Sequence, residues 1–213
     1  MLSADEIVRL HDRRVHTWHE AEADPCEFAF DAEACGASAA PAWLTAVARQ
    51  HRANFELWHI EDEARTPGAT DAELAQVKRR IDRMNQRRND LAEDLDRLLL
   101  EWLGERGLPR AAAELHSESP GLIIDRLSIL ALKIYHTREE GTRAQAPPGH
   151  AELNRQRLAI LEEQRADLAC CLDALWRETL AGTRRFKLYQ QLKMYNDPAL
   201  NPAIYGKSAA TRT

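Results

Sequence analysis

The sequence predicts an all-α protein, built as a bundle of long antiparallel helices. Strand signals are nearly absent from its 213 residues, whereas apolar residues recur at steps of three and four over long stretches. Charged residues make up 30% of the chain and hydrophobic residues 44%, which is ordinary for a globular protein. A chain of this length can bury a sizeable core.

The first two helices are expected at about residues 4–23 and from Pro41 onward. An alanine-rich loop separates them and shows little periodicity. Pro41 suits the first turn of a helix, because its missing N–H would have no partner there in any case. The turn Thr66-Pro67-Gly68 marks the end of the second helix.

The third helix has the clearest start signal. Thr70 and Glu73 have the spacing of a capping box, in which each side chain binds the backbone of the other residue. This helix continues to Gly104 or Gly107 and presents an apolar seam to its neighbours. The seam is Leu74, Val77, Ile81, Met84, Leu91, Leu95, Leu98 and Trp102.

The remaining segments are also read as helices. The fourth begins at Ser119-Pro120-Gly121 and is apolar nearly all round, as expected for an interior helix. We therefore expect an N-terminal helix and loop, a core bundle and a C-terminal basic-aromatic helix that caps it and leads into an extended tail. Their bounds are 1–40, 41–183 (hairpins 41–107 and 119–182) and 184–213.

The two hairpins resemble each other at an offset of 77 residues, which predicts an internal duplication with a pseudo-twofold axis. Heptad repeats alone would explain matching leucines, but they would not explain matching polar residues. The polar matches are Arg88 with Arg165, Asp90 with Asp167, Asp96 with Asp173, His59 with His136, and Asp62 and Glu63 with Glu139 and Glu140.

Arg88 and Arg165 interrupt apolar seams, so each needs a negative partner. Folding the second hairpin about its loop brings Arg165 level with Asp125, the one acid of the apolar fourth helix, and predicts an ion pair between them. Arg88 would share Asp125 or hold an external anion, since a planar guanidinium suits phosphate or carboxylate. The alternative is a buried network that only fixes the helix register.

Two acidic patterns suggest metal binding. His59 precedes acids at helical spacing, and His136 repeats the pattern, although such groups near helix ends are commonly solvated. A second set loosely resembles the acidic motifs of all-helical nucleotide pyrophosphohydrolases, which hold magnesium against phosphates. The candidate magnesium ligands are Glu61, Asp62, Asp90 and Glu93.

The other histidines and the C-terminal stretch carry weaker signals. His11, His16 and His19 lie on the first helix without matching acids, so we expect surface or packing roles. After residue 183, basic and aromatic residues alternate, which fits a single-stranded nucleic acid, a phosphorylated ligand or a capping helix with solvated cations.

Composition excludes several classes. A net charge of −5 and a pI near 5.9 argue against a nucleic-acid-binding surface over the whole protein. No apolar stretch nears the ~20 residues of a membrane span, and the N-terminus lacks the pattern of a secretion signal. None of the four cysteines forms a Cys-x-x-Cys pair. We expect a reduced, cytoplasmic protein.

Four stretches together resemble a bacterial family called domain of unknown function 4254. They are residues 54–65, 85–90, 119–133 and 182–201, and the resemblance covers roughly residues 41–205. The family has no established activity, but its members are similar to proteins found beside cell-surface sugar-transfer genes. The resemblance therefore implies a link to glycan assembly and fixes no chemistry.

We therefore predict a binding or adaptor protein with a polar pocket for an anionic, phosphorylated or nucleotide-sugar ligand, or a surface that docks a partner enzyme. The alternative is a metal-dependent nucleotide or nucleotide-sugar phosphohydrolase. The sequence makes no cofactor certain, and magnesium is one candidate. A homodimer is also compatible with the sequence. The candidate ligand-binding residues are Asn54, Arg88, Asn89, Asp125, Arg126, Lys133, Arg165, Arg184 and Arg185.

Overall fold

The computed structural model describes residues 2–20, 42–192 and 200. This part of the chain is all-helical apart from one pair of two-residue strands, which confirms the predicted all-α class. No helix within it is long and apolar enough to cross a membrane. The elements are α1 (Ala4–Glu20), α2 (Ala42–Glu63), α3 (Asp71–Gly104), β1 (Glu114–Leu115), α4 (Pro120–Thr142), α5 (His150–Leu180) and β2 (Arg184–Arg185).

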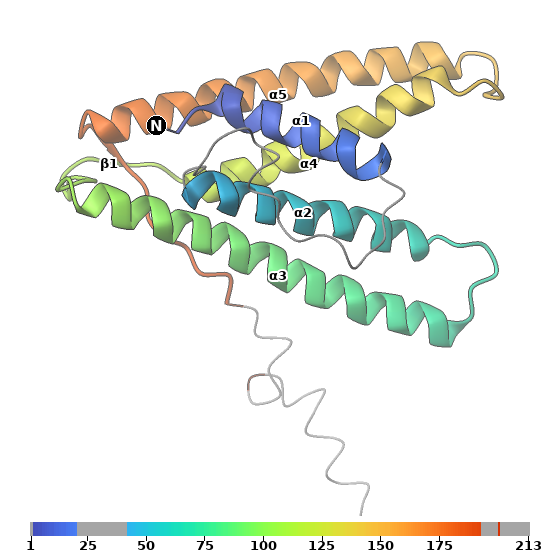
Figure 1. The fold of residues 1–213 in the computed structure, drawn as a ribbon, viewed down its shortest axis with the longest axis horizontal. Coiled ribbons are helices and arrows are strands. Elements are labelled where there is room, and N and C mark those ends of the chain that lie inside the picture. Colours follow the sequence, from blue (N-terminus) through green and yellow to red (C-terminus); the bar gives the residue numbers. More distant parts are fainter. Residues whose placement is uncertain (1, 21–41, 193–199, 201–213) are drawn as a thin grey trace, which may run out of the picture.

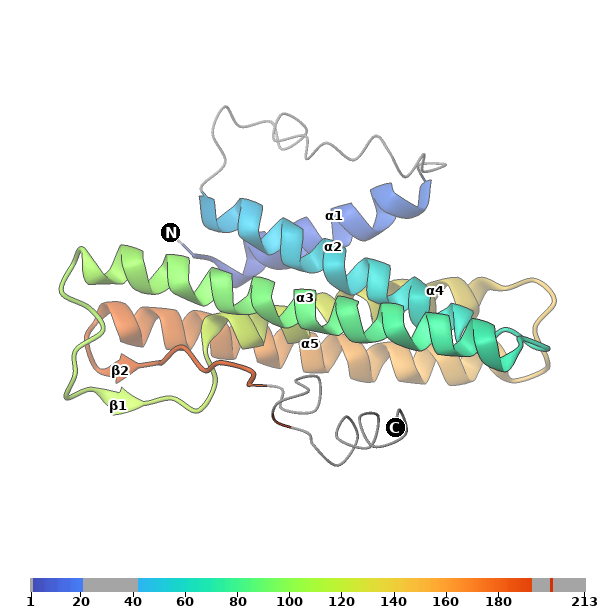
Figure 2. The same cartoon turned by 90° about the horizontal axis from the view of Figure 1, so that it is seen from below.

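The long helices form two adjacent hairpins, α2 with α3 and α4 with α5 (Figure 1). Helix α4 lies innermost and contacts all four other helices. The shorter α1 packs on α4, α2 and α5, on one side of the molecule (Figures 1 and 2). The predicted loop after α1 lies outside the described residues.

Local signals set the helix starts as the sequence predicts. Thr70 and Glu73 form the capping box at the start of α3. Ser119 caps α4, with its hydroxyl accepting from the backbone N–H of Leu122. Gly121 is needed beside it, because a Cβ there would lie 2.4 Å from the carbonyl oxygen of Ala92 on α3.

The core lies around α4, where Ile124 and Leu127 have no exposed surface. The seam predicted for α3 is wrong at its ends, because Leu74, Leu98 and Trp102 are 36–37% exposed. The buried residues of its C-terminal half are Ala92, Leu95, Asp96, Leu99 and Leu103, so the buried face is rotated by about one residue from the predicted one.

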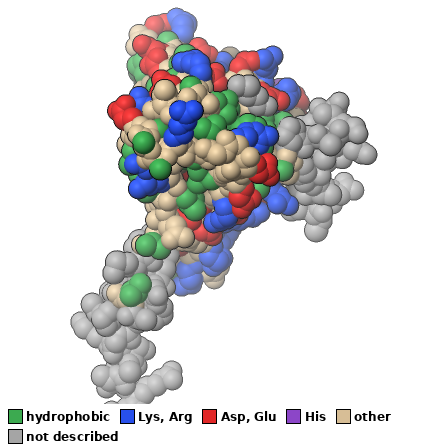
Figure 3. Space-filling view, turned by 90° about the vertical axis from the view of Figure 1, so that its left-hand side faces the viewer, with side chains coloured by type: hydrophobic (Ala, Val, Ile, Leu, Met, Phe, Trp, Pro, Cys, Tyr) green, Lys and Arg blue, Asp and Glu red, His purple; other side chains and the backbone are tan. Residues whose placement is uncertain are grey.

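The predicted C-terminal helix is wrong over residues 184–192. Arg184 and Arg185 form β2, which pairs in parallel with β1 at Glu114 and Leu115. This extended backbone places Phe186 in the core, where it is 2% exposed. Basic and acidic side chains are interspersed on this end of the molecule (Figure 3). Burial of one aromatic ring thus outweighs the helical pattern there.

Candidate metal centre

Three histidines from three helices meet between α1, α2 and α4. They are His19 at the end of α1, His59 near the end of α2 and His136 in the second half of α4. Each offers one ligand nitrogen, and the three nitrogens lie within 4.8 Å of one another. Across residues 2–20 and 42–192, no other group of three His, Cys, Asp or Glu side chains is arranged to hold a metal ion.

Aromatic side chains enclose the cluster. Tyr135 stacks on His19 with 4.4 Å between the ring centroids, and Trp58 stacks on His136 at 4.9 Å. Phe55 meets the third imidazole edge-on at 4.5 Å. These contacts limit how far the three imidazole rings can turn.

Hydrogen bonds set which nitrogen of two rings is available. The Nδ1 atom of His19 lies 2.8 Å from the carbonyl oxygen of Val15, and Nδ1 of His136 lies 2.9 Å from Oε2 of Glu139. Both oxygens accept, so each Nδ1 carries the proton and each Nε2 keeps a lone pair. These Nε2 atoms are buried and have no hydrogen-bond partner in the structure.

A buried imidazole nitrogen without a partner loses the hydrogen bond that water would give it. A metal ion would supply the missing contact. Metal-binding histidines usually donate their other N–H to a carboxylate or a carbonyl, which orients the ring. His19 and His136 have this arrangement through Val15 and Glu139.

Burial also favours the neutral rings that bind metals. Desolvation is the largest cause lowering the pKa of His59 and of His136, and the nearby His19 lowers both pKa values further. Asp62 partly opposes this shift, because its negative charge raises the pKa of both rings. Asp62 therefore lies close enough to act on the cluster electrostatically.

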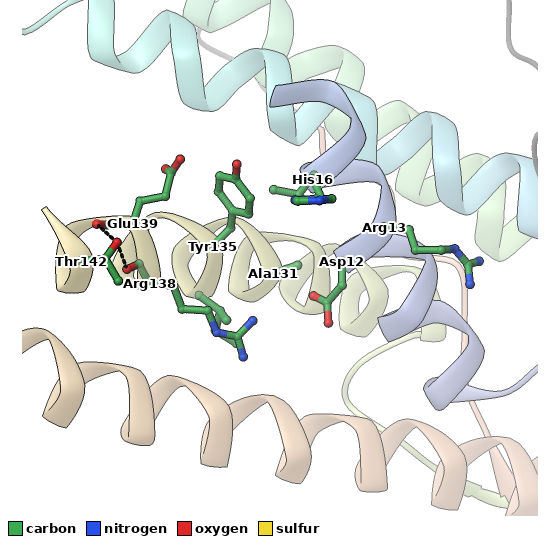
Figure 4. Close-up of a pocket in the computed structure, with 10 residues that line it drawn as sticks. Asp12, Arg13, His16, Ala131, Tyr135, Arg138, Glu139 and Thr142 are labelled. Carbon is green, nitrogen blue, oxygen red and sulfur yellow. Dashed lines mark hydrogen bonds between the residues drawn. The ribbon is translucent and has the colours of Figure 1, made fainter. Parts of the chain in front are cut away.

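A depression of about 630 Å³ between α1 and α4 adjoins the cluster. Tyr135 and Glu139 line it and point to the same side of α4, whereas Arg138 extends to the other side (Figure 4). None of the three histidines lines this depression, although Tyr135, which stacks on His19, does.

The predicted polar centre exists as a separate buried network. Arg88 donates from Nε to Oδ1 of Asp125 at 2.8 Å and from Nη2 to Oδ2 at 2.5 Å. Gln50 and Asn54 donate to Oδ1 as well, at 2.5 and 2.9 Å. The Asp125 carboxylate raises the pKa of Arg88. Because Arg88 is already paired in a bidentate manner, the network resembles a register-fixing element more than an anion site.

The ion pair predicted between Asp125 and Arg165 is wrong. Arg165 donates instead to Asp12 of α1 at 2.7 Å. Helix periodicity correctly placed Arg165 on an inward face, where its side chain is 15% exposed, but it could not predict that α1 covers α5 there.

The other candidate ligand residues do not converge on Arg88. Arg126 pairs with Glu118 at 2.9 Å on the surface, and Lys133 is exposed beside the groove between α4 and α5. Asn89 is half-buried, whereas Arg184 pairs with Glu114 and Glu178, and Arg185 donates to the carbonyl of Ala113.

The four candidate magnesium ligands belong to separate surroundings. Glu61 and Asp62 pair with Arg65 at the end of α2. Asp90 accepts from Gln86, and Glu93 accepts from the backbone of Gln191. In the part of the chain that the structure describes, they form no joint ligand set.

His19 is the site residue that sequence reasoning missed, since it was assigned a surface or packing role. His59 and His136 were singled out by their repeated spacing to acids. No local pattern links His19 to them, because the link depends on how α1 packs across α2 and α4. Within α1, His19 lies next to the apolar residues Val15 and Trp18, and this neighbourhood alone does not indicate a metal ligand.

The family model "Protein of unknown function (DUF4254)" matches residues 44–188, and the chain belongs to this family. The match runs from the first turn of α2 to just beyond β2 and leaves α1, which carries His19, outside it. No curated protein and no solved structure matches the chain significantly.

Proposed function

We propose that this protein binds one divalent transition-metal ion through His19, His59 and His136. The observation that carries the proposal is the pair of buried, unpartnered Nε2 atoms on His19 and His136, each oriented by a hydrogen bond on the opposite side of its ring. A packing role would not require both nitrogens to face the same small space.

The donor set indicates the class of metal. Neutral imidazoles suit zinc, copper, nickel and iron rather than magnesium, which prefers oxygen ligands. Zinc–nitrogen bonds of about 2.0–2.1 Å place tetrahedral ligands roughly 3.3 Å apart, a spacing that small ring rotations would reach. Three protein ligands leave one position for water or another ligand, as in catalytic zinc sites.

A second proposal retains the anionic ligand expected from the sequence. Arg88 does not support this ligand, because Asp125 neutralises it. Positive side chains elsewhere on the α2–α3 hairpin support it instead. The metal-dependent phosphohydrolase remains the alternative, with histidines in place of the predicted acids as metal ligands. The link to cell-surface glycan assembly remains a prediction from family resemblance.

We also propose that the α2–α3 and α4–α5 hairpins arose by internal duplication. Two contacts join residues 77 positions apart, as a twofold axis between α2 and α4 would require. His51 bonds Ser128 at 2.7 Å, and the rings of His59 and His136 lie 6.1 Å apart. These contacts support a shared origin of the two hairpins.

Metal titration of the tag-free, full-length protein tests the main proposal. We expect one zinc ion per chain by calorimetry, and cobalt should give the visible absorption of a tetrahedral site. His59→Ala or His136→Ala should weaken binding at least about 100-fold, since each removes one of three ligands.

His16→Ala is the matched control, because His16 lies on α1 with its side chain 63% exposed, outside the cluster. Its zinc affinity should equal that of the wild type. Zinc binding that is equally tight in the His59→Ala and His136→Ala proteins would overturn the proposal.

A further inference from the structure

A positively charged groove lies beside the proposed metal centre, between α2 and the first half of α3. Its volume is about 660 Å³. It contains Arg52, Arg80, Arg83 and Arg87 but only two acids, Glu56 and Glu63. We call this feature the arginine groove. Two positive charges remain in excess here, although the whole protein carries a net charge of −5.

The spacing of these arginines places them on one face of α3. Residues 80, 83 and 87 are separated by three and four positions, so their guanidinium groups are neighbours. Like charges at this spacing destabilise a helix unless a negative group lies between them. The facing residues of α2 only partly provide that negative charge.

The two glutamates leave hydrogen-bond donors unused. Glu63 pairs with Arg80, and Glu56 is shared between Arg52 at 2.9 Å and Arg87 at 3.4 Å. Among the residues that the structure describes, none forms an ion pair or hydrogen bond with Arg83, which is exposed. Arg83 and Arg87 therefore have guanidinium N–H groups available for an anion.

The arginine groove is also the approach to the histidines. His59 lines it directly, together with the arginines of α3 and with Phe55. On the other sides, Trp58 covers the ring of His136 and Tyr135 covers the ring of His19. A ligand in the groove would therefore meet the metal from the side of His59.

We propose that the arginine groove binds the phosphate group of a small phosphorylated ligand, next to the open position of the metal. The part of this inference that places the phosphate next to a metal ion rests on the proposed metal site. Arg83 and Arg87 supply forked donors that match phosphate oxygens, and the metal supplies a second positive centre at the inner end of the groove. The expected ligands are therefore small molecules that carry a phosphate group.

Inorganic phosphate is the probe for this inference. It is titrated by calorimetry into full-length protein loaded with zinc and freed of excess metal, and in parallel into metal-free protein. We expect phosphate to bind both forms and to bind the zinc-loaded form at least about 5-fold more tightly, since the coupling of two sites is typically 5–150-fold. Binding should weaken with added salt.

The charge variant is Arg83→Gln with Arg87→Gln, and Arg79→Gln is the matched control. Arg79 is an exposed residue of the same helix and does not line the groove. The double variant should lose at least about 10-fold in phosphate affinity and keep its zinc affinity, whereas the control should keep both. Zinc affinity shows that the double variant is folded.

Failure of the inference and failure of the metal proposal give different results. Phosphate affinity that is unchanged in the double variant overturns the groove, even if zinc binds. Phosphate affinity that is equal with and without bound zinc overturns the claim that the two form one site. Loss of zinc binding in the wild type, with arginine-dependent phosphate binding retained, overturns the proposed function and leaves an anion groove alone.

Discussion

Arg88 of α3 and Arg165 of α5, which correspond in the proposed duplication, meet acids from different helices. Arg88 pairs with Asp125 of α4, which is 10% exposed and accepts two further amide hydrogen bonds. Arg165 pairs with Asp12 of α1, which is 41% exposed. One arginine therefore belongs to a buried network, and the other belongs to an ion pair whose acid is partly exposed.

The aspartates at positions 96 and 173 repeat this contrast. Asp96 of α3 is 2% exposed and accepts from Ser119 and from the backbone of Gly121, both at the start of α4. Asp173 of α5 is exposed and accepts from the backbone of Ala4 in α1. Asp173 of α5 is thus contacted by α1, whereas Asp96 of α3 is contacted by α4. The surroundings of the two hairpins differ because α1 packs on only one of these two aspartates.

The largest expected effect comes from breaking the buried network with Arg88→Met. Asp125 would keep its amide donors but lose its only counter-charge among the residues that the structure describes. Breaking a buried ion pair typically costs 3–5 kcal/mol. We expect the free energy of unfolding, measured with urea, to fall by about that amount.

Arg87→Met serves as the control for this variant, because the Arg87 side chain is 58% exposed. Its cost should stay below about 1 kcal/mol. A loss of less than about 1 kcal/mol in Arg88→Met as well would show that the network contributes no more than a surface pair.

The second prediction concerns pH. Desolvation is the largest cause raising the pKa of Asp96 to about 6, against hydrogen bonds from Ser119 and Gly121 that lower it. The unfolded pKa is about 3.9, so the folded state binds more protons between pH 4 and 6. Stability from this group therefore rises as pH falls through that window and is lost above pH 6.

The effect of this one group is on the order of 3 kcal/mol between pH 7 and 4. Urea unfolding of wild type and Asp96→Asn over this range isolates it, because the other carboxylates are common to both. The stability difference between them should change with pH. A pH-independent difference in Asp96→Asn would contradict the prediction.

The third prediction sharpens the comparison at the metal centre. Glu139 and Asp62 each follow a cluster histidine by three positions, but only Glu139 bonds its histidine, whereas Asp62 pairs with Arg65 at 3.7 Å. Removing an outer-shell partner typically costs 10–100-fold in metal affinity.

We therefore expect zinc to bind Glu139→Gln about 10–100-fold more weakly and Asp62→Asn only a few-fold more weakly, as measured by calorimetry. Equal losses in the two variants would mean that the carboxylates act by long-range charge alone. No loss in either would remove Glu139 from the site.

Much of the fold could be predicted because its signals are local. The capping box of Thr70 and the cap at Ser119 fix helix starts through backbone groups only a few residues away. The apolar residues on nearly every side of α4 identified the central helix. The caps depend on residues three positions apart along the chain, so the sequence alone is enough to find them.

The site was harder to predict because its contacts cross between helices. Asp125 and Arg88 were recognised as charges on apolar faces, which is a reliable sign of a buried partner. Which helix supplies the partner depends on packing, so Arg165 was assigned to Asp125 rather than to Asp12. His19 was missed for the same reason, since both Asp12 and His19 belong to α1.

The smallest expected effect tests the role assigned to α1. Asp12→Asn should lower the free energy of unfolding by about 1 kcal/mol or less, because Asp12 is 41% exposed and water screens the charge of its carboxylate. Arg165→Met should cost a similar amount, and a double-mutant cycle by urea unfolding gives the coupling between them. The same cycle on Arg88 and Asp125 should give a coupling several times larger. Equal couplings would mean that the greater exposure of Asp12 does not weaken its pair with Arg165, and the two hairpins would then be energetically alike despite their different partners.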